Sequence, residues 1–149
     1  MTYNDLIPEL GVLDIEASLR FYTQTLPFKI EYQRQDVGFA FLSLGNSQLM
    51  LEQVSATDAA TDEELRAGAW RTGALEYPLG RGMNLEIRVE SLDQILLALA
   101  NANYPLKMQP REAWYRRETI LIGQRQILVM DPDGYLLRFH EVLGERPAD

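Results

Sequence analysis

The chain has 149 residues, of which 46% are hydrophobic, with a net charge of −8 and no cysteine. This length suits one compact domain, and the negative charge argues against binding to the phosphate backbone of nucleic acids. Disulfides and thiolate chemistry are excluded, and no apolar run is long enough to span a membrane. We therefore expect a single cytoplasmic domain over residues 1–149, without nucleic-acid or membrane partners.

The first half of the chain, residues 5–54, has the pattern of a strand, a helix and further strands. A short extended segment ends at Asp14, which is a suitable N-cap residue. The apolar residues that follow have helical spacing and are Ile15, Leu19, Tyr22 and Leu26. The extended segment "FKIEYQ" comes next, and then a predicted hairpin of "VGFAFLSL" and "SQLMLEQV".

The connecting segment, residues 55–81, differs from both halves. It begins with acidic and cap-forming residues, and Asp62 to Glu64 favour the first turn of a short helix because carboxylates suit the positive end of the helix dipole. Trp70 and Tyr77 follow in a stretch with loop composition.

The second half, residues 82–143, repeats the order of the first. In "NLEIRV" the polar and apolar residues alternate, as is typical of a strand with one buried face. Ser91 and Gln94 fit a capping box at the start of a second helix. The apolar residues of that helix are Leu92, Ile95, Leu96 and Leu99. The extended segment "YPLKMQ" and a hairpin of "RQILVM" and "YLLRFHEV" complete the half.

An aromatic pair lies in the second half, in "PREAWYRRETILIG". Trp114 and Tyr115 are flanked by arginines there, and we predict that they lie in a connection, as Trp70 does. Aromatic side chains in connections stack on planar ligands or anchor a second subunit. The alternative is that they cover the edge of the core.

The acidic stretch Asp131 to Gly134 separates the two predicted strands of the last hairpin. Proline at its second position and glycine at its fourth are typical of a type I turn. We therefore predict a connector here, and not a metal loop or an acid–base pair of carboxylates.

Two segments together resemble the vicinal oxygen chelate superfamily, which includes glyoxalase I, extradiol dioxygenases and bleomycin resistance proteins. They are "PELGVLDIEASLRFYTQTLPF" and "ILVMDPDGYLLRF", and Pro27 departs from the glycine usual in the family after the first helix. The resemblance implies an α+β fold, in which two tandem βαβββ modules form a curled mixed sheet with a cleft. In this superfamily a second subunit commonly completes the cleft.

The resemblance also locates the positions where the metal enzymes of the superfamily carry their ligands. These positions hold Ile7, Glu52, Asn84 and Arg138 in this sequence. An aliphatic side chain cannot coordinate a metal, and a guanidinium repels one. We therefore predict no metal, no other cofactor and no catalytic residue.

The polar sides of the strands would then line the cleft. In the last strand Leu137 and Phe139 alternate with Arg138 and His140, and Glu9, Gln48, Met50 and Glu52 join the polar set by the same parity. These residues either line a ligand site or form the solvent-facing side of the sheet. The predicted ligand-binding residues are Phe39, Glu52, Trp70, Glu86, Arg88, Trp114, Tyr115 and Arg138.

Three functions remain open on these observations. The leading hypothesis is a metal-free homodimer of the bleomycin resistance type, which sequesters a cationic, partly aromatic molecule such as a bleomycin-type glycopeptide. The second is a glyoxalase-type lyase, isomerase or dioxygenase with Glu9, Glu52 and His140 as unusual metal ligands. The third is a protein that binds an endogenous metabolite.

Overall fold

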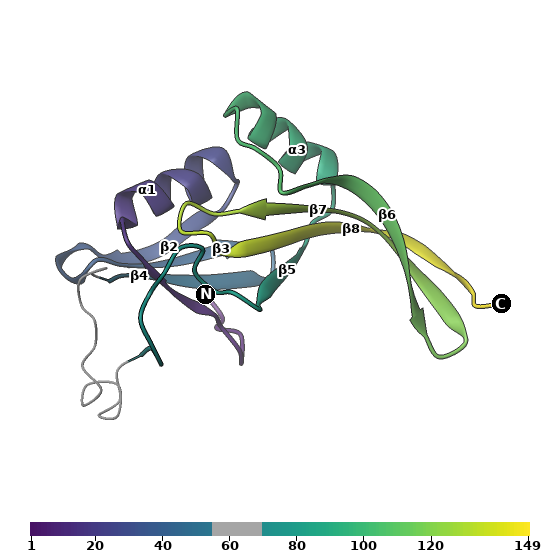
Figure 1. Ribbon diagram of the computed structural model, residues 1–149, viewed down its shortest axis with the longest axis horizontal. Coiled ribbons are helices and arrows are strands. Elements are labelled where there is room, and N and C mark those ends of the chain that lie inside the picture. The colour runs from purple at the N-terminus through teal and green to yellow at the C-terminus, as the bar shows by residue number, and fades with distance from the viewer. Residues whose placement is uncertain (55–69) are drawn as a thin grey trace.

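The computed structural model describes residues 1–54 and 70–149, and it contains two tandem modules, each with one four-stranded sheet (Figure 1). The first module consists of β1 (Glu9–Val12), α1 (Ile15–Arg20), β2 (Lys29–Arg34), β3 (Phe39–Leu44) and β4 (Ser47–Gln53). The second consists of β5 (Asn84–Arg88), α3 (Leu92–Asn101), β6 (Met108–Arg117), β7 (Ile120–Met130) and β8 (Leu136–Pro147). The predicted helix around Asp62 to Glu64 lies outside the described residues.

The two sheets have the same topology. Their strand orders are β1-β4-β3-β2 and β5-β8-β7-β6, and in each sheet the first strand is parallel to its neighbour while the others are antiparallel. The prediction of tandem βαβββ modules is confirmed. The strands form two separate mixed sheets and not one continuous sheet.

Each sheet has one face that is covered by the helices and one face that is not. Helices α1 and α3 lie on the same side of the molecule (Figure 1). The apolar set predicted for the strands packs there: Ile87, Leu137 and Phe139 belong to the core, together with Leu10, Val12, Leu42 and Leu51 from the first sheet. We call the opposite side of each sheet its bare face.

The starts of the two helices are built differently. Asp14 caps α1 as predicted, since its carboxylate accepts a hydrogen bond of 3.0 Å from the backbone N–H of Ala17. The capping box predicted at Ser91 is wrong, because the Ser91 side chain makes no cap hydrogen bond. The backbone N–H of Leu92 donates instead to the carboxylate of Glu141 on β8, at 2.7 Å. A long-range partner thus replaces the local one that the sequence indicated.

The acidic turn between β7 and β8 is confirmed as a turn, in which the Gly134 N–H donates to the carbonyl of Asp131 at 3.0 Å. Gly134 has a positive φ of 91°, and a Cβ there would lie 2.6 Å from the Cα of Pro78, so the position requires glycine. Both aspartates of the turn are buried. The turn is therefore more than a connector at the surface.

The two buried aspartates join the second module to the first. Asp131 accepts a hydrogen bond of 2.8 Å from the hydroxyl of Tyr22, which follows α1. Asp133 accepts hydrogen bonds from the backbone N–H of Leu13 at 3.2 Å and from the hydroxyl of Ser18 at 3.4 Å. We call this set of contacts the module clasp.

The carboxylates of the module clasp are buried. Burial raises the pKa of Asp131 to about 6, although the Tyr22 hydroxyl and the backbone N–H groups of Asp133 and Tyr135 donate to it. Burial and the neighbouring Asp131 raise the pKa of Tyr22 well above its usual value, which keeps this hydroxyl a donor.

The strands β6, β7 and β8 continue beyond α3 as a projecting arm (Figure 1). We define the arm as residues 111–125 and 141–147. Trp114 lies within β6 and pairs with Gly123 of β7, so the prediction that it lies in a connection is wrong. A Cβ at Gly123 would come within 2.6 Å of the Trp114 ring, and the guanidinium of Arg146 lies 4.1 Å from the ring centroid. This tryptophan is thus packed between its strand neighbours.

Among the described residues, no helix has the length and apolar character that a membrane span requires.

Candidate functional site

Aromatic side chains gather on the bare face of the first sheet. Tyr32 of β2 stacks on Phe41 of β3 with ring centroids 5.4 Å apart and an angle of 13° between the planes. Phe39 lies 5.8 Å from Tyr32, and Tyr3 meets Phe41 edge to face at 5.4 Å. Phe39 and Phe41 are buried although they face away from the core, while 37% of Tyr32 is exposed. We call these four residues the aromatic platform.

Charged groups border the aromatic platform. In the register of the sheet Phe39 pairs with Glu52, and Glu52 pairs with Gly11, two residues beyond Glu9 in β1. Burial and the neighbouring Glu52 raise the pKa of Glu9, while Arg34 lowers it, so charges of both signs lie close together here. The guanidinium of Arg34 lies 4.2 Å from the centroid of the Phe39 ring. Arg34 of the chain itself thus makes a cation–π contact with the platform.

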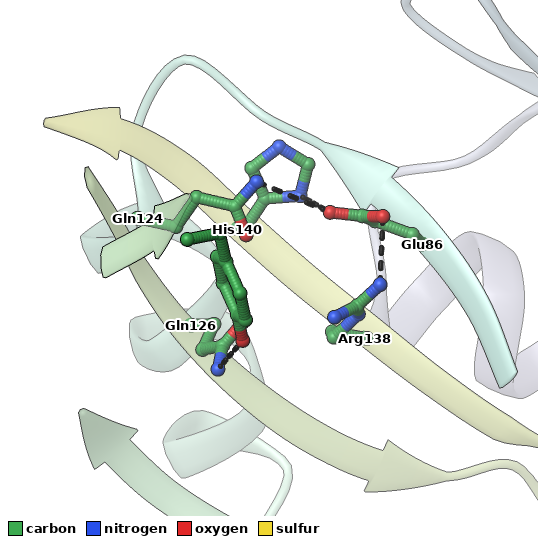
Figure 2. A network of polar contacts seen from close by, with 6 residues as sticks. Glu86, Gln124, Gln126, Arg138 and His140 are labelled. Carbon is green, nitrogen blue, oxygen red and sulfur yellow. Dashed lines mark hydrogen bonds and ion pairs between the residues drawn. The ribbon is translucent and has the colours of Figure 1, made fainter. Parts of the chain in front are cut away.

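A polar cluster occupies the bare face of the second sheet and centres on Glu86 of β5 (Figure 2). One carboxylate oxygen accepts a hydrogen bond of 2.7 Å from Arg138, and the other accepts one of 3.3 Å from the amide of Gln124. The same second oxygen lies 3.3 Å from Nδ1 of His140. Residues from two strands, β7 and β8, thus converge on one carboxylate of β5.

A buried amide adjoins this cluster. Gln126 of β7 is 2% exposed and exchanges two hydrogen bonds with the hydroxyl of Tyr115 on β6, of 2.8 Å and 3.2 Å. Gln126 also pairs with His140 across the strands. Three buried atoms of the cluster have no hydrogen-bond partner among the described residues, namely Oε1 of Gln124, Nε of Arg138 and Nδ1 of His140. These three atoms could therefore form further hydrogen bonds, for which the described residues supply no partner.

A cavity of about 370 Å³ is lined by residues of both modules. Phe28 and Leu49 of the first module and Ile87 of the second give it an apolar part. Gln48, Asn84 and Glu86 give it a polar part. A space of this volume accommodates a small metabolite, and it borders the polar cluster through Glu86.

Comparison with known proteins places this architecture in a family. The sequence matches the profile of the glyoxalase/bleomycin resistance protein/dioxygenase superfamily over residues 7–139. The chain belongs to this superfamily. No curated protein matches it.

Solved structures that resemble this superfamily member agree with its fold. TioX from Micromonospora sp. ML1 has a TM-score of 0.66 at 16% identity, with 95% of this chain and 100% of that chain covered. Virulence protein STM3117 from Salmonella typhimurium has a TM-score of 0.62 at 20% identity, with 95% and 98% covered. Lactoylglutathione lyase from Agrobacterium tumefaciens has a TM-score of 0.57 at 14% identity, with 94% and 95% covered. At these identities the likeness concerns the fold alone.

The metal chemistry of the superfamily does not fit the residues of this chain. Within residues 1–54 and 70–149 no three His, Asp or Glu side chains converge as a metal site requires. The alternative ligand set of Glu9, Glu52 and His140 does not assemble, because these three side chains do not form such a group in the described part of the chain. A metal-dependent reaction therefore has no ligand set among the described residues.

The structure divides the predicted site residues between the two bare faces. Phe39 and Glu52 belong to the aromatic platform and its border, whereas Glu86, Arg138 and Tyr115 belong to the polar cluster. Arg88 pairs with His140 in the register of β5 and β8.

The two tryptophans lie outside both groups. Trp114 and Tyr115 are consecutive in β6 and so point to opposite faces, with Trp114 turned away from the polar cluster. Trp70 is 89% exposed, and no ring of the platform contacts it within the described residues. Trp114 and Tyr115 therefore have different surroundings.

Several residues of these groups were not predicted from the sequence. They are Tyr3, Tyr32, Phe41, Gln124 and Gln126. Phe41 could have been predicted from "VGFAFLSL". It lies two residues after Phe39 in the same strand, so both side chains point to the same face as Glu52. Tyr3 precedes the first strand, so no strand periodicity places it.

Proposed function

We propose that this superfamily member is a metal-independent binding protein of the bleomycin resistance type, and that its aromatic platform holds a cationic, partly aromatic molecule. The observation that carries the proposal is the meeting of four aromatic rings with two carboxylates on one bare face. Sequestration by this surface requires no change of covalent bonds in the ligand.

The chemistry of the platform favours a planar cation. Aromatic faces attract cations by about 0.5 to 2 kcal/mol for each contact, and the Arg34 guanidinium on Phe39 is an internal example. Burial and the repulsion from Glu52 raise the pKa of Glu9, and a bound cation would relieve this repulsion. The net charge of −8 attracts the same class of ligand from solution.

We also propose that two copies form a cytoplasmic homodimer in which the arm of one copy covers the platform of the other. The arm carries five arginines against four glutamates, whereas the whole chain has a net charge of −8. Its apolar side chains Tyr115, Val142 and Leu143 are exposed at 41%, 42% and 39%. A mildly basic arm with exposed apolar residues complements an acidic, aromatic surface on a second copy.

Calorimetric titration with bleomycin, copper-free and copper-loaded, tests the binding proposal. We expect binding at micromolar concentration, and Tyr32→Leu and Glu52→Gln should each weaken it about tenfold, because Tyr32 is a partly exposed ring of the platform and each substitution removes one attraction for the cation. Glu16→Gln is the matched control, since Glu16 is an exposed carboxylate on α1, on the covered side of the first sheet.

A second probe separates the ligand class from the antibiotic itself. Proflavine is a planar cation without the rest of the bleomycin molecule. If proflavine binds through Tyr32 and Glu52 while bleomycin does not, the natural ligand is a different cation, such as an endogenous metabolite. If neither probe binds at micromolar concentration, the proposed function is wrong.

A further inference from the structure

The segment that precedes β1 lies against the bare face of the first sheet, and we call its residues 2–8 the strap. Tyr3 of the strap meets Phe41 edge to face, with ring centroids 5.4 Å apart and an angle of 89° between the planes. Phe41 is 1% exposed although it faces away from the core, whereas Tyr3 itself is 56% exposed. Tyr3 and the stacked Tyr32 thus cover a ring that would otherwise face solvent.

Polar contacts at the surface hold the strap in this position. The backbone N–H of Asn4 donates to Oε1 of Gln48 at 2.7 Å, and Nε2 of Gln48 donates to the carbonyl of Thr2 at 2.7 Å. The side-chain amide of Asn4 donates to the carbonyl of Asn46 at 2.6 Å. All three hydrogen bonds are exposed, so water can replace them at little net cost. Leu6 is 82% exposed and adds no buried apolar contact.

The strap joins the hydrogen-bond ladder of the sheet at Pro8. The carbonyl of Pro8 accepts a hydrogen bond of 2.9 Å from the N–H of Met50, and β1 begins at the next residue. Because proline fixes its own φ, a movement of the strap takes place in the residues before it. Rotation of the backbone there carries Tyr3 off the platform and leaves the pairing of β1 with β4 unchanged.

Two groups of the chain itself cover the buried rings of the platform, and they differ in what their displacement by a cation would gain. The guanidinium of Arg34 lies 4.2 Å from the centroid of Phe39. A cationic ligand in its place would exchange one cation–π contact for another, with little gain. A cationic ligand in the place of Tyr3 would replace a contact between two uncharged rings with a cation–π contact on Phe41. Tyr3 is therefore the cover that a cation displaces.

We propose that the strap is an autoinhibitory segment, in which Tyr3 occupies the place on Phe41 that a planar cation takes, and that ligand binding displaces it. This inference rests on the proposed function and adds the ring that the ligand reaches beyond the partly exposed Tyr32. The place suits a cation because Phe41 pairs with Met50 and Met50 pairs with Glu9, which puts a carboxylate in the same row across the sheet. The affinity for the ligand is then reduced by the fraction of molecules in which the strap is closed.

Variants that release the strap should bind a planar cation more tightly. Tyr3→Ala removes the covering ring, and Gln48→Ala removes two of the three hydrogen bonds that hold the strap. In calorimetric titration each should bind proflavine about fivefold to tenfold more tightly than the unmodified chain, because Phe41 is uncovered in more of the molecules. Tyr3→Phe keeps the ring, and Gln94→Ala removes an exposed glutamine of α3, so both should bind as the unmodified chain does.

The position of the strap can also be measured without reference to affinity. We expect nuclear Overhauser contacts between the ring protons of Tyr3 and Phe41 in the unmodified chain. These contacts should weaken in Gln48→Ala, and they should disappear when the unmodified chain is saturated with proflavine. Amide NMR spectra and sedimentation velocity of each variant establish that its fold and its state of assembly are unchanged.

Two results would overturn the autoinhibitory role and leave the proposed function intact. One is proflavine binding by folded Tyr3→Ala and Gln48→Ala that is equal to or weaker than binding by the unmodified chain, which would make Tyr3 a wall of the ligand site. The other is persistence of the contacts between Tyr3 and Phe41 in the proflavine complex. If neither the unmodified chain nor any variant binds proflavine, the proposed function itself is wrong, and the autoinhibitory role fails with it.

Discussion

At the scale of single residues, Asp131 is an acidic side chain in a buried position. Its carboxylate accepts hydrogen bonds from the Tyr22 hydroxyl and from two backbone N–H groups, yet burial still raises its pKa to about 6. An ordinary aspartate in the unfolded chain titrates near 4. The folded chain therefore binds this proton more tightly than the unfolded chain does.

This difference predicts a pH dependence of stability. The stabilising contribution is complete below about pH 4 and is lost as the pH rises through about 6, with a total of up to about 3 kcal/mol. Urea denaturation between pH 4 and 7 should show the unfolding free energy of the unmodified chain falling relative to that of Asp131→Asn. Asp36→Asn, at an exposed position, should retain the pH dependence of the unmodified chain. Parallel curves for the unmodified chain and Asp131→Asn would contradict this account.

At the scale of elements, the arm depends on the contact between Trp114 and Gly123. A Cβ at position 123 would lie 2.6 to 2.8 Å from the atoms of the indole ring, closer than packed carbon atoms approach. The ring is also held from the side of β8 by Arg146. Glycine at this position therefore allows the tryptophan to lie flat across the strands.

We expect Gly123→Ala to lower the unfolding free energy by about 1 to 3 kcal/mol, because the added methyl group displaces the ring. Trp114→Leu should make the same substitution much less costly, which a double-mutant cycle in urea measures. Gly73→Ala is the control, since a Cβ there meets nothing within 4 Å. A cost for Gly123→Ala that is independent of Trp114 would show that the contact is not its cause.

The elements were predictable from sequence where the cause is local. The alternation of "NLEIRV", the N-cap Asp14 and the turn at Gly134 each depend on neighbouring residues, and each appears in the structure. The cap of α3 was not predictable, because its acceptor, Glu141, lies 49 residues away from Leu92.

The same limit applies to the candidate site. The sequence placed Glu86 and Arg138 on one polar face, because period-two alternation is local. It did not separate Trp114 from Tyr115, since an arginine-rich aromatic segment has the composition of a connection as well as that of a strand edge. Their opposite orientations follow only once β6 is paired with β7.

At the scale of the whole molecule, the distribution of charge and of exposed apolar residues supports the proposed dimer. We expect sedimentation velocity to give twice the mass of the chain. Leu143→Asp should favour the monomer, because it places a charge among the exposed apolar residues of the arm. Leu97→Asp, at an exposed leucine of α3 away from the arm, should leave the dimer intact. A monomeric unmodified chain would rule out this assembly.

The module clasp also bears on the order in which the chain acquires its structure during synthesis. Tyr22, Ser18 and Leu13 emerge from the ribosome early, but the carboxylates that accept their hydrogen bonds emerge only with the turn before β8. Until then the amino-terminal module must leave these donors to water. Completion of its interior thus waits for nearly the last strand to be translated, which couples the two modules into one cooperative folding event.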